Sequence, residues 1–219
     1  METEDLLKIA QIASEVENPN ALEAFKLILD RFHLKDGEDI SPKESTDGVY
    51  VIYKSGFAVK YKEGMNITDI VNYIGLKIGG KCIAVALKDV SDEEITLTIN
   101  KDETSYKKYV DNSIDALSDW DGKENTEHLK EIGLNPEIKL EEGEYIAAGG
   151  EFSFINLFVK SINEALKAVG GGPLSGWYWT SSEYSAANAW YLNLGNGNLG
   201  MATKVSGQNR VRAVAAFSL

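Results

Sequence analysis

Side chains that could carry out covalent or metal-dependent chemistry are scarce in this sequence of 219 residues. The single cysteine, Cys82, begins the apolar run 82–87, and this setting predicts a small buried hydrophobe in place of a nucleophile. The two histidines, His33 and His128, lie far apart, and neither accompanies a nucleophile motif such as Gly-x-Ser-x-Gly. We therefore expect no thiolate or imidazole metal site, no cofactor and no enzymatic activity.

One stretch has the beginning of a calcium-binding loop. Residues 119–122 read Asp-Trp-Asp-Gly, but the third early acid and the closing glutamate of an EF-hand are missing. We interpret this stretch as a structural turn.

The triple glycine at 170–172 follows a helical pattern, whereas a phosphate-binding loop precedes its helix, so we do not interpret it as a phosphate site.

The strongest functional signal is a composition typical of binding surfaces, in residues 176–198. Tyrosine, tryptophan, serine, asparagine and glycine dominate this stretch, which is nearly free of charge. Rigid aromatic rings provide contact area at low entropic cost, and small polar residues adapt their hydrogen bonds to a partner. We expect Trp179 and Trp190 to fill the core. The residues that we predict to contact a ligand are Tyr178, Tyr184, Asn188, Tyr191, Asn193, Asn196, Asn198, Met201, Gln208 and Asn209.

The pattern of residues 188–194 predicts how a strand there is oriented. Period-two alternation places Trp190, Leu192 and Leu194 on one face, and Tyr191 and Asn193 on the other. We expect the second face to be exposed. Arg210 and Arg212 flank the last predicted strand, and we expect at least one of them to pair with a nearby acid.

The net charge and its distribution along the chain limit which classes of binding partner we expect. The net charge is −12, and residues 151–219 contain five basic and three acidic residues, so the negative charge is concentrated in the first 150 residues. Such a field repels phosphate backbones, and we expect no nucleic-acid binding. No apolar stretch approaches the roughly 20 residues of a membrane-spanning helix, so we expect no membrane insertion. The acidic start has no secretory signal, which favours a phage virion, or the cytoplasm before release.

The first 36 residues predict a helical hairpin. Leu6, Ile9, Ala13 and Val16 follow helical spacing, and residues 22–32 repeat that spacing after an Asn-Pro start signal. Two interpretations stay open, because each helix has only two heptads. The hairpin packs on its own domain, or it joins subunits into a homo-oligomer.

The remaining sequence predicts an α+β domain over residues 47–219, after a polar linker at 36–47. A strand hairpin, a short helix, two strands, two longer helical regions and C-terminal strands are expected. The hairpin strands are expected at 49–53 and 57–61, the short helix at 67–74, and the two following strands at 81–87 and 94–99. The helical regions are expected at 106–133, with an interruption at 118–125, and at 152–169. The C-terminal strands are expected at 199–205 and 210–217.

The C-terminal segment resembles a known family. Trp-Tyr-Trp-Thr-Ser-Ser-Glu-Tyr-Ser at 177–185, Asn-Ala-Trp-Tyr at 188–191 and Arg-Val-Arg-Ala-Val-Ala-Ala-Phe at 210–217 look like the C-terminal part of bacterial and phage C-type-lectin-fold domains. That family includes variable proteins diversified by retroelements, such as phage tropism determinants, and surface adhesins. Stretches 119–126 and 162–175 are also similar to it, so the likeness covers roughly residues 47–219.

The resemblance implies a C-type-lectin-like domain preceded by the helical hairpin, and a ligand-binding function. Ligand contacts would come from exposed positions of the last sheet and its loops, above a hydrophobic strand core. The partner would be a protein or a glycan on a cell surface.

Two departures from related families limit what the resemblance implies. Animal C-type lectins hold calcium through Glu-Pro-Asn or Gln-Pro-Asp and carry disulfides, and this chain has neither. Formylglycine-generating enzymes share the broader fold but need paired cysteines, whereas Cys82 is alone. The alternatives to a ligand-binding protein are a structural subunit of a virion or fimbria, and a degenerate relative of these enzymes.

Overall fold

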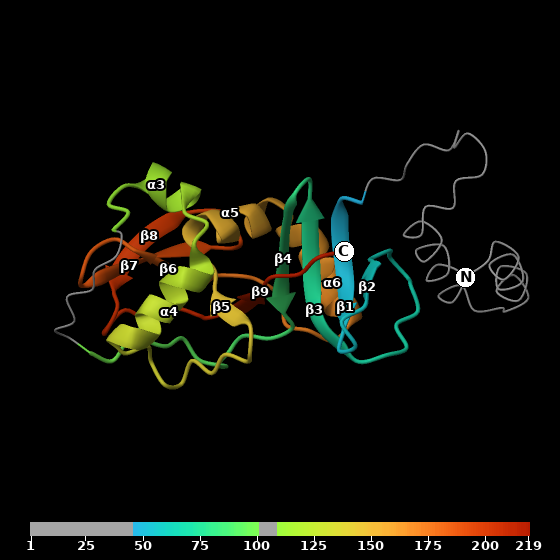
Figure 1. Ribbon diagram of the computed structural model, residues 1–219, viewed down its shortest axis with the longest axis horizontal. Coiled ribbons are helices and arrows are strands. Elements are labelled where there is room, and N and C mark those ends of the chain that lie inside the picture. The colour runs from blue at the N-terminus through green and yellow to red at the C-terminus, as the bar shows by residue number, and fades with distance from the viewer. Residues whose placement is uncertain (1–45, 101–108) are drawn as a thin grey trace, which may run out of the picture. The chain divides into compact units, whose positions relative to one another are not determined.

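The computed structural model describes residues 46–100 and 109–219, all within the compact unit Thr46–Leu219. This part of the chain is α+β, with two antiparallel sheets and few helices (Figure 1). The helical hairpin expected at 1–36 lies outside the described residues.

The larger sheet has six strands in the order β2-β1-β3-β4-β9-β5, and every neighbouring pair is antiparallel. Its first two strands form the hairpin expected from the sequence, and the last strand of the chain lies between β4 and β5. The bounds are β1 Gly48–Tyr53, β2 Ala58–Lys60, β3 Val71–Ile78, β4 Lys81–Ala86, β5 Glu144–Ile146 and β9 Ala213–Ala215.

The smaller sheet contains three consecutive strands in the order β6-β7-β8, again antiparallel. Their bounds are β6 Trp177–Glu183, β7 Asn188–Asn193 and β8 Leu199–Thr203. Trp179 and Trp190 are buried in this sheet, as the sequence predicts. The alternation within β7 is also confirmed, because Trp190 and Leu192 are buried while Tyr191 and Asn193 are half-buried.

Four helices are described between and beside these strands: α3 Ser113–Ser118, α4 Gly122–Ile132, α5 Gly149–Leu157 and α6 Val159–Ala168. Helix α6 packs its apolar stripe, which includes Ile162 and Leu166, on one face of β1 and β3 (Figure 1). Helix α4 places Leu129 and Ile132 in a second core cluster with Trp179. Both clusters contain residues of the two sheets.

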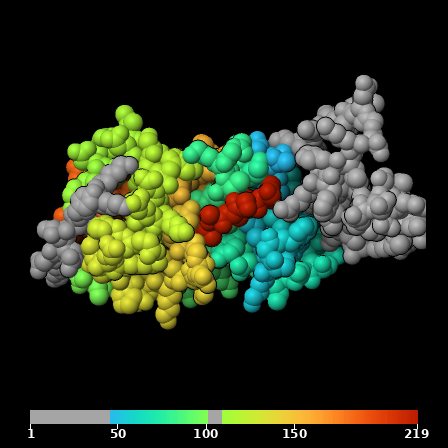
Figure 2. Space-filling model, viewed as in Figure 1, coloured from blue at the N-terminus to red at the C-terminus, as the bar shows by residue number. Residues whose placement is uncertain are grey.

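The residues after β9 cover the other face of β1 and β3. The ring centroid of Phe217 lies 6.2 Å from that of Tyr50. A Cβ atom at Gly75 would lie only 2.8 Å from the Phe217 ring, so this close approach requires glycine. Figure 2 shows these last residues, in red, as a narrow band across the surface.

The segment before β9 joins the two sheets. The N–H of Arg210 donates to the carbonyl of Trp177 at 3.0 Å, and the N–H of Trp179 donates to the carbonyl of Arg210 at 2.9 Å. Three residues later the chain enters the larger sheet. The strand expected at 210–217 is therefore shorter than predicted, because its first residues pair with β6 instead of β4.

Three further sequence predictions are corrected. The helix expected at 67–74 is wrong, because Val71–Ile78 forms β3, whose β-branched and aromatic residues pair with strands on both sides. Residues 94–99 form only isolated bridges at Ile95 and Thr98. The helix expected at 152–169 is broken at Phe158, which has φ −119° and ψ 14°.

Candidate functional site

The register of the smaller sheet divides the predicted ligand contacts between its two faces. Tyr191 lies opposite Trp179 on β6 and opposite Gly200 on β8, while Asn193 lies opposite Trp177. Directly paired residues share a face, so all five lie on one side of the sheet. We call the accessible part of this side the Tyr191 face, defined by Trp177, Tyr191, Asn193, Gly200 and Gln208.

Tyr191 is held by aromatic rings in this face. Its ring centroid lies 5.0 Å from that of Trp177 and 6.0 Å from that of Trp179, both in edge-to-face geometry. On the third side the ring lies over Gly200, where an added Cβ would be 2.7 Å from the hydroxyl end of the tyrosine. The phenol group therefore has a defined position in the absence of a ligand.

Asn193 organises the turn at the end of β7. Its Oδ1 atom accepts hydrogen bonds from the N–H groups of Gly195 at 2.8 Å and Asn196 at 3.2 Å. The side chain of Asn196 in turn accepts from the N–H of Asn198 at 3.0 Å. Within the described residues, the amide nitrogen of Asn193 has no protein partner, so its two donors are available to a ligand.

The loop at 206–209 borders the same face. A Cβ atom at Gly207 would lie 2.8 Å from that of Ala202 and 3.1 Å from the ring of Trp179, so the loop covers this tryptophan closely. The indole N–H of Trp179 donates to the carbonyl of Ile95 at 2.8 Å. Gln208, the next residue of this loop, is exposed.

Three other predicted contacts, Tyr184, Asn188 and Met201, lie on the opposite side of the sheet. Asn188 and Met201 share a face with Trp190, because Met201 pairs directly with Trp190 on the neighbouring strand. Tyr184 stacks edge-to-face on Trp190, with ring centroids 5.4 Å apart. We call this the Met201 face, defined by Tyr184, Asn188 and Met201. One ligand surface cannot include both faces of a packed sheet.

Two predicted contacts are buried, which corrects the expectation that they are exposed. Tyr178 has no exposed surface, and its hydroxyl donates to Asp89 at 3.3 Å. Burial raises the pKa of Tyr178, and the negative charge of Asp89 raises it further. Asn209 is also buried, and its backbone pairs with that of Ile95.

The carboxylate of Asp89 also binds the two arginines of the closing segment. The Nε atom of Arg212, which is buried, lies 2.6 Å from Asp89, and Arg210 lies 3.7 Å from it. The other guanidinium nitrogens of Arg212 donate to the carbonyls of Ala86 and Gly172. The expectation that at least one arginine pairs with an acid is confirmed for both.

The Asp-Trp-Asp-Gly stretch forms a turn whose first acid binds protein donors. The carboxylate of Asp119 accepts from the Ser182 hydroxyl at 2.6 Å, from the Asn125 amide at 2.9 Å and from the N–H of Asp121 at 3.1 Å. These bonds connect the turn to β6 and α4. Throughout residues 46–100 and 109–219, no group of three or more histidine, cysteine or acidic residues is arranged to hold a metal ion.

A buried ion pair at the end of β6 was not predicted from the sequence. Lys204 donates to the carboxylate of Glu183, and both side chains are almost fully buried. The Nε2 atom of His128 lies 3.6 Å from the same carboxylate. These residues are distant in the sequence, and no motif identifies them.

Trp177 is the residue of the Tyr191 face that sequence reasoning missed. It lies in the aromatic run already singled out, but only the β6–β7 register shows that it is half-buried next to Tyr191 and Asn193. Cys82, expected to be a small buried hydrophobe, is half-buried in β4. No helix among the described residues has the length and apolar character needed to cross a membrane.

Comparison with known proteins does not add a family to this description. No protein-family model matches the chain, and no curated protein matches it.

Proposed function

We propose that this protein is a non-enzymatic ligand-binding protein with a C-type-lectin-like domain, and that the Tyr191 face is its binding surface. The ligand would be a protein or a glycan on a cell surface, as expected for the phage and bacterial variable proteins and adhesins that the sequence resembles. Of the predicted contacts, Tyr191, Asn193 and Gln208 belong to this surface, and Trp177 is added to them.

One observation carries this proposal: a phenol ring and an amide with free donors lie side by side on a rigid sheet. The rings of Trp177 and Trp179 hold Tyr191 from two directions, and the turn after β7 holds Asn193. Preorganised groups lose little conformational freedom on binding, so more of their contact energy appears as affinity.

The arrangement of the strands supports the lectin-like proposal. The surface is built on the last three consecutive strands before the closing segment. The buried Trp179 lies on the same side of the sheet, and the buried Leu192 lies on the opposite side. The C-terminal strand then returns to the middle of the larger sheet, beside β4. A hydrophobic strand core beside accessible positions on the last sheet is the arrangement that the lectin-like proposal requires.

A structural subunit of a virion or fimbria is the second candidate, and the Met201 face favours it. Strand β8 lies at the edge of the described sheet, its sequence Leu-Gly-Met-Ala-Thr has no charge, and Met201 is 47% exposed. An uncharged edge strand can pair with a strand of another chain. In that case the Met201 face would be an assembly interface.

A cell-binding assay with labelled full-length protein separates the two candidates. Tyr191→Phe removes only the hydroxyl, and Asn193→Asp keeps the oxygen that the turn needs while replacing the amide donors. We expect each change to weaken binding by about 1–2 kcal/mol. Met201→Ala, an exposed change on the opposite face, is the matched control and should leave binding unchanged.

Thermal melts of the same variants show whether the fold is intact. Trp179→Ala and Trp190→Ala should lower stability by about 3–5 kcal/mol, because each leaves a cavity in the core. Full binding by Tyr191→Phe and Asn193→Asp together with loss of binding or assembly in Met201→Ala would contradict the first candidate and support the second.

Retroelement diversification is tested in the gene neighbourhood. A reverse-transcriptase gene beside a near-copy of the codons for 177–217, differing at adenines, would establish it. A neighbourhood without such a copy would reject diversification and leave the binding proposal intact.

A further inference from the structure

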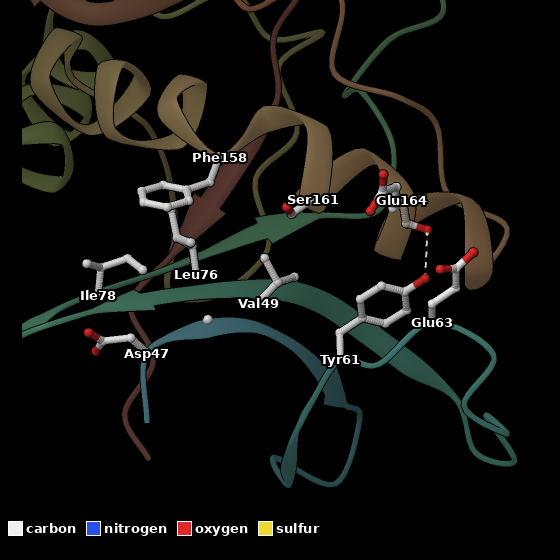
Figure 3. Close-up of a pocket in the computed structure, with 10 residues that line it drawn as sticks. Asp47, Val49, Tyr61, Glu63, Leu76, Ile78, Phe158, Ser161 and Glu164 are labelled. Atoms are coloured by element: carbon white, nitrogen blue, oxygen red, sulfur yellow. Dashed lines mark hydrogen bonds between the residues drawn. The ribbon is translucent and has the colours of Figure 1, made fainter. Parts of the chain in front are cut away.

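A hollow between helix α6 and the larger sheet lies away from both faces of the smaller sheet. It is open to solvent and has a volume of about 360 Å³, which is enough for a small molecule. Its apolar wall comes from β1, β3 and the start of α6 (Figure 3). The apolar residues are Val49, Leu76, Ile78 and Phe158.

The charge of this hollow has one sign. Of its ten lining residues, three are acidic and none is basic. Asp47 accepts a hydrogen bond from the N–H of Gly79 and lies 3.6 Å from Lys77, so its charge is already balanced in part. Glu63 and Glu164 are exposed, and within the described part of the chain neither has a salt-bridge partner.

Tyr61 connects these two acids to the apolar wall. Its hydroxyl donates to the main-chain carbonyl of Glu164 at 3.4 Å, which places its ring below the helix (Figure 3). Figure 3 shows Glu63 and Glu164 at the Tyr61 end of the hollow, and Asp47 at the other end. Burial raises the pKa of Tyr61, and the negative charges of Glu63 and Glu164 raise it further. Both carboxylates therefore act electrostatically on the Tyr61 hydroxyl group.

We propose that this hollow binds a small organic cation, an ammonium group attached to an apolar body. The ammonium group would lie between the carboxylates of Glu63 and Glu164, near the ring of Tyr61, where a cation is also attracted by the aromatic face. The apolar body would lie along Val49, Leu76 and Phe158. The same chemistry occurs in a free alkylamine and in a lysine side chain of a peptide.

Titrations of the full-length protein, followed by NMR, test the proposal with n-hexylammonium as the probe. Signals of Tyr61 and of the Val49 and Leu76 methyl groups should shift saturably at concentrations up to about 10 mM. Hexanol, which lacks the charge, and hexanoate, which reverses it, should bind at least about fivefold more weakly. Nα-acetyl-lysine N-methylamide represents a lysine side chain in a peptide, and hexylammonium represents a free alkylamine. The probe that binds more tightly identifies which of the two the hollow prefers.

Two exposed substitutions measure the contribution of the carboxylates. Glu63→Gln and Glu164→Gln should each raise the dissociation constant of hexylammonium about three- to fivefold. Glu142→Gln removes the same charge from an exposed acid outside the hollow and should change it little. Because all three side chains are exposed, melts should be unchanged.

Absence of saturable shifts for both amines would overturn the proposal. Equal binding of hexanol, or an equal loss of affinity in Glu142→Gln, would also overturn it, because the hollow would then not select a cation. This test is independent of the Tyr191 face.

Discussion

Tyr191 shows how a single side chain can be prepared for contact by its neighbours. Two tryptophan rings approach its edges, and Gly200 leaves room for its hydroxyl end. The position of the phenol group therefore depends on a residue that contributes no side chain. A substitution at Gly200 would act on the binding surface through Tyr191.

We expect Gly200→Ala to displace the Tyr191 ring and to lower stability by about 1–3 kcal/mol, because the added methyl group would lie 2.7 Å from the ring. The matched control is Gly80→Ala, where an added Cβ meets no atom within 4 Å, and its melting temperature should change little. Thermal melts and the near-UV circular dichroism of the tyrosines measure the two effects. Equal melting temperatures for both variants would contradict the close contact.

At this scale the sequence predicts the burial of the two tryptophans, but it predicts poorly which residues share a surface. The burial of Trp190 follows from the alternation in β7, and the burial of Trp179 follows from its size. The separation of Tyr191 from Met201 does not, because it depends on the pairing of three strands. The prediction that Tyr178 is exposed is wrong. Nothing in its sequence neighbourhood indicates that its hydroxyl donates a hydrogen bond to Asp89.

Among the elements, the start of α5 contains the most strongly perturbed acid. Glu151 is buried, its carboxylate accepts from the N–H of Ala148 at 2.8 Å and from the hydroxyl of Tyr145 at 3.0 Å, and Gly122 packs against it. Burial raises the pKa of Glu151 to about 7, although these two hydrogen bonds lower it. The same burial, with the charge of Glu151, raises the pKa of Tyr145.

Protonation of Glu151 therefore couples to folding. Its folded pKa of about 7 is above its ordinary value of 4.5, so the proton binds more tightly to the folded protein. The resulting stabilisation is complete below about pH 4.5 and is lost as the pH rises to about 7, and it amounts to roughly 3 kcal/mol. We expect Glu151→Gln to remove this part of the pH dependence.

Denaturant unfolding between pH 4.5 and 8 measures this effect. Glu127→Gln, a change at an exposed acid on α4, serves as the control and should retain the dependence. An unchanged slope in Glu151→Gln would show that this carboxyl group does not titrate in that range.

Elements were predicted best where local pattern and tertiary contacts agree. The β1–β2 hairpin and β4 have clear local signals. The prediction of a helix where β3 lies is wrong because this segment forms a strand by pairing with β1 on one side and β4 on the other, and these contacts are not visible in the local sequence. The hollow beside α6 had no sequence signal, because Tyr61, Glu63 and Glu164 meet only in the folded chain.

Over the whole molecule, the C-terminal segment holds the domain together. It pairs first with β6, then lies between β4 and β5, and finally covers β1 and β3 with Phe217. Arg212 adds buried hydrogen bonds to Asp89, Ala86 and Gly172 along this path. Removal of this segment would open the larger sheet between β4 and β5.

We expect deletion of residues 213–219 to abolish cooperative unfolding, because β4 and β5 lose the strand between them. Deletion of Ser218 and Leu219, which are both exposed, should leave the melt unchanged. Circular dichroism and limited proteolysis distinguish the two products. A native melt for the longer deletion would show that β9 is dispensable.

The position of β9 also determines when the protein can fold during its synthesis. Strand β4 leaves the ribosome long before its partner β9 exists, and its edge, with the apolar sequence Cys-Ile-Ala-Val-Ala, stays open meanwhile. The larger sheet is completed only after residues 213–215 have been translated, since its contacts join distant parts of the sequence. Prematurely terminated chains would thus be substrates for chaperones and proteases instead of smaller folded domains.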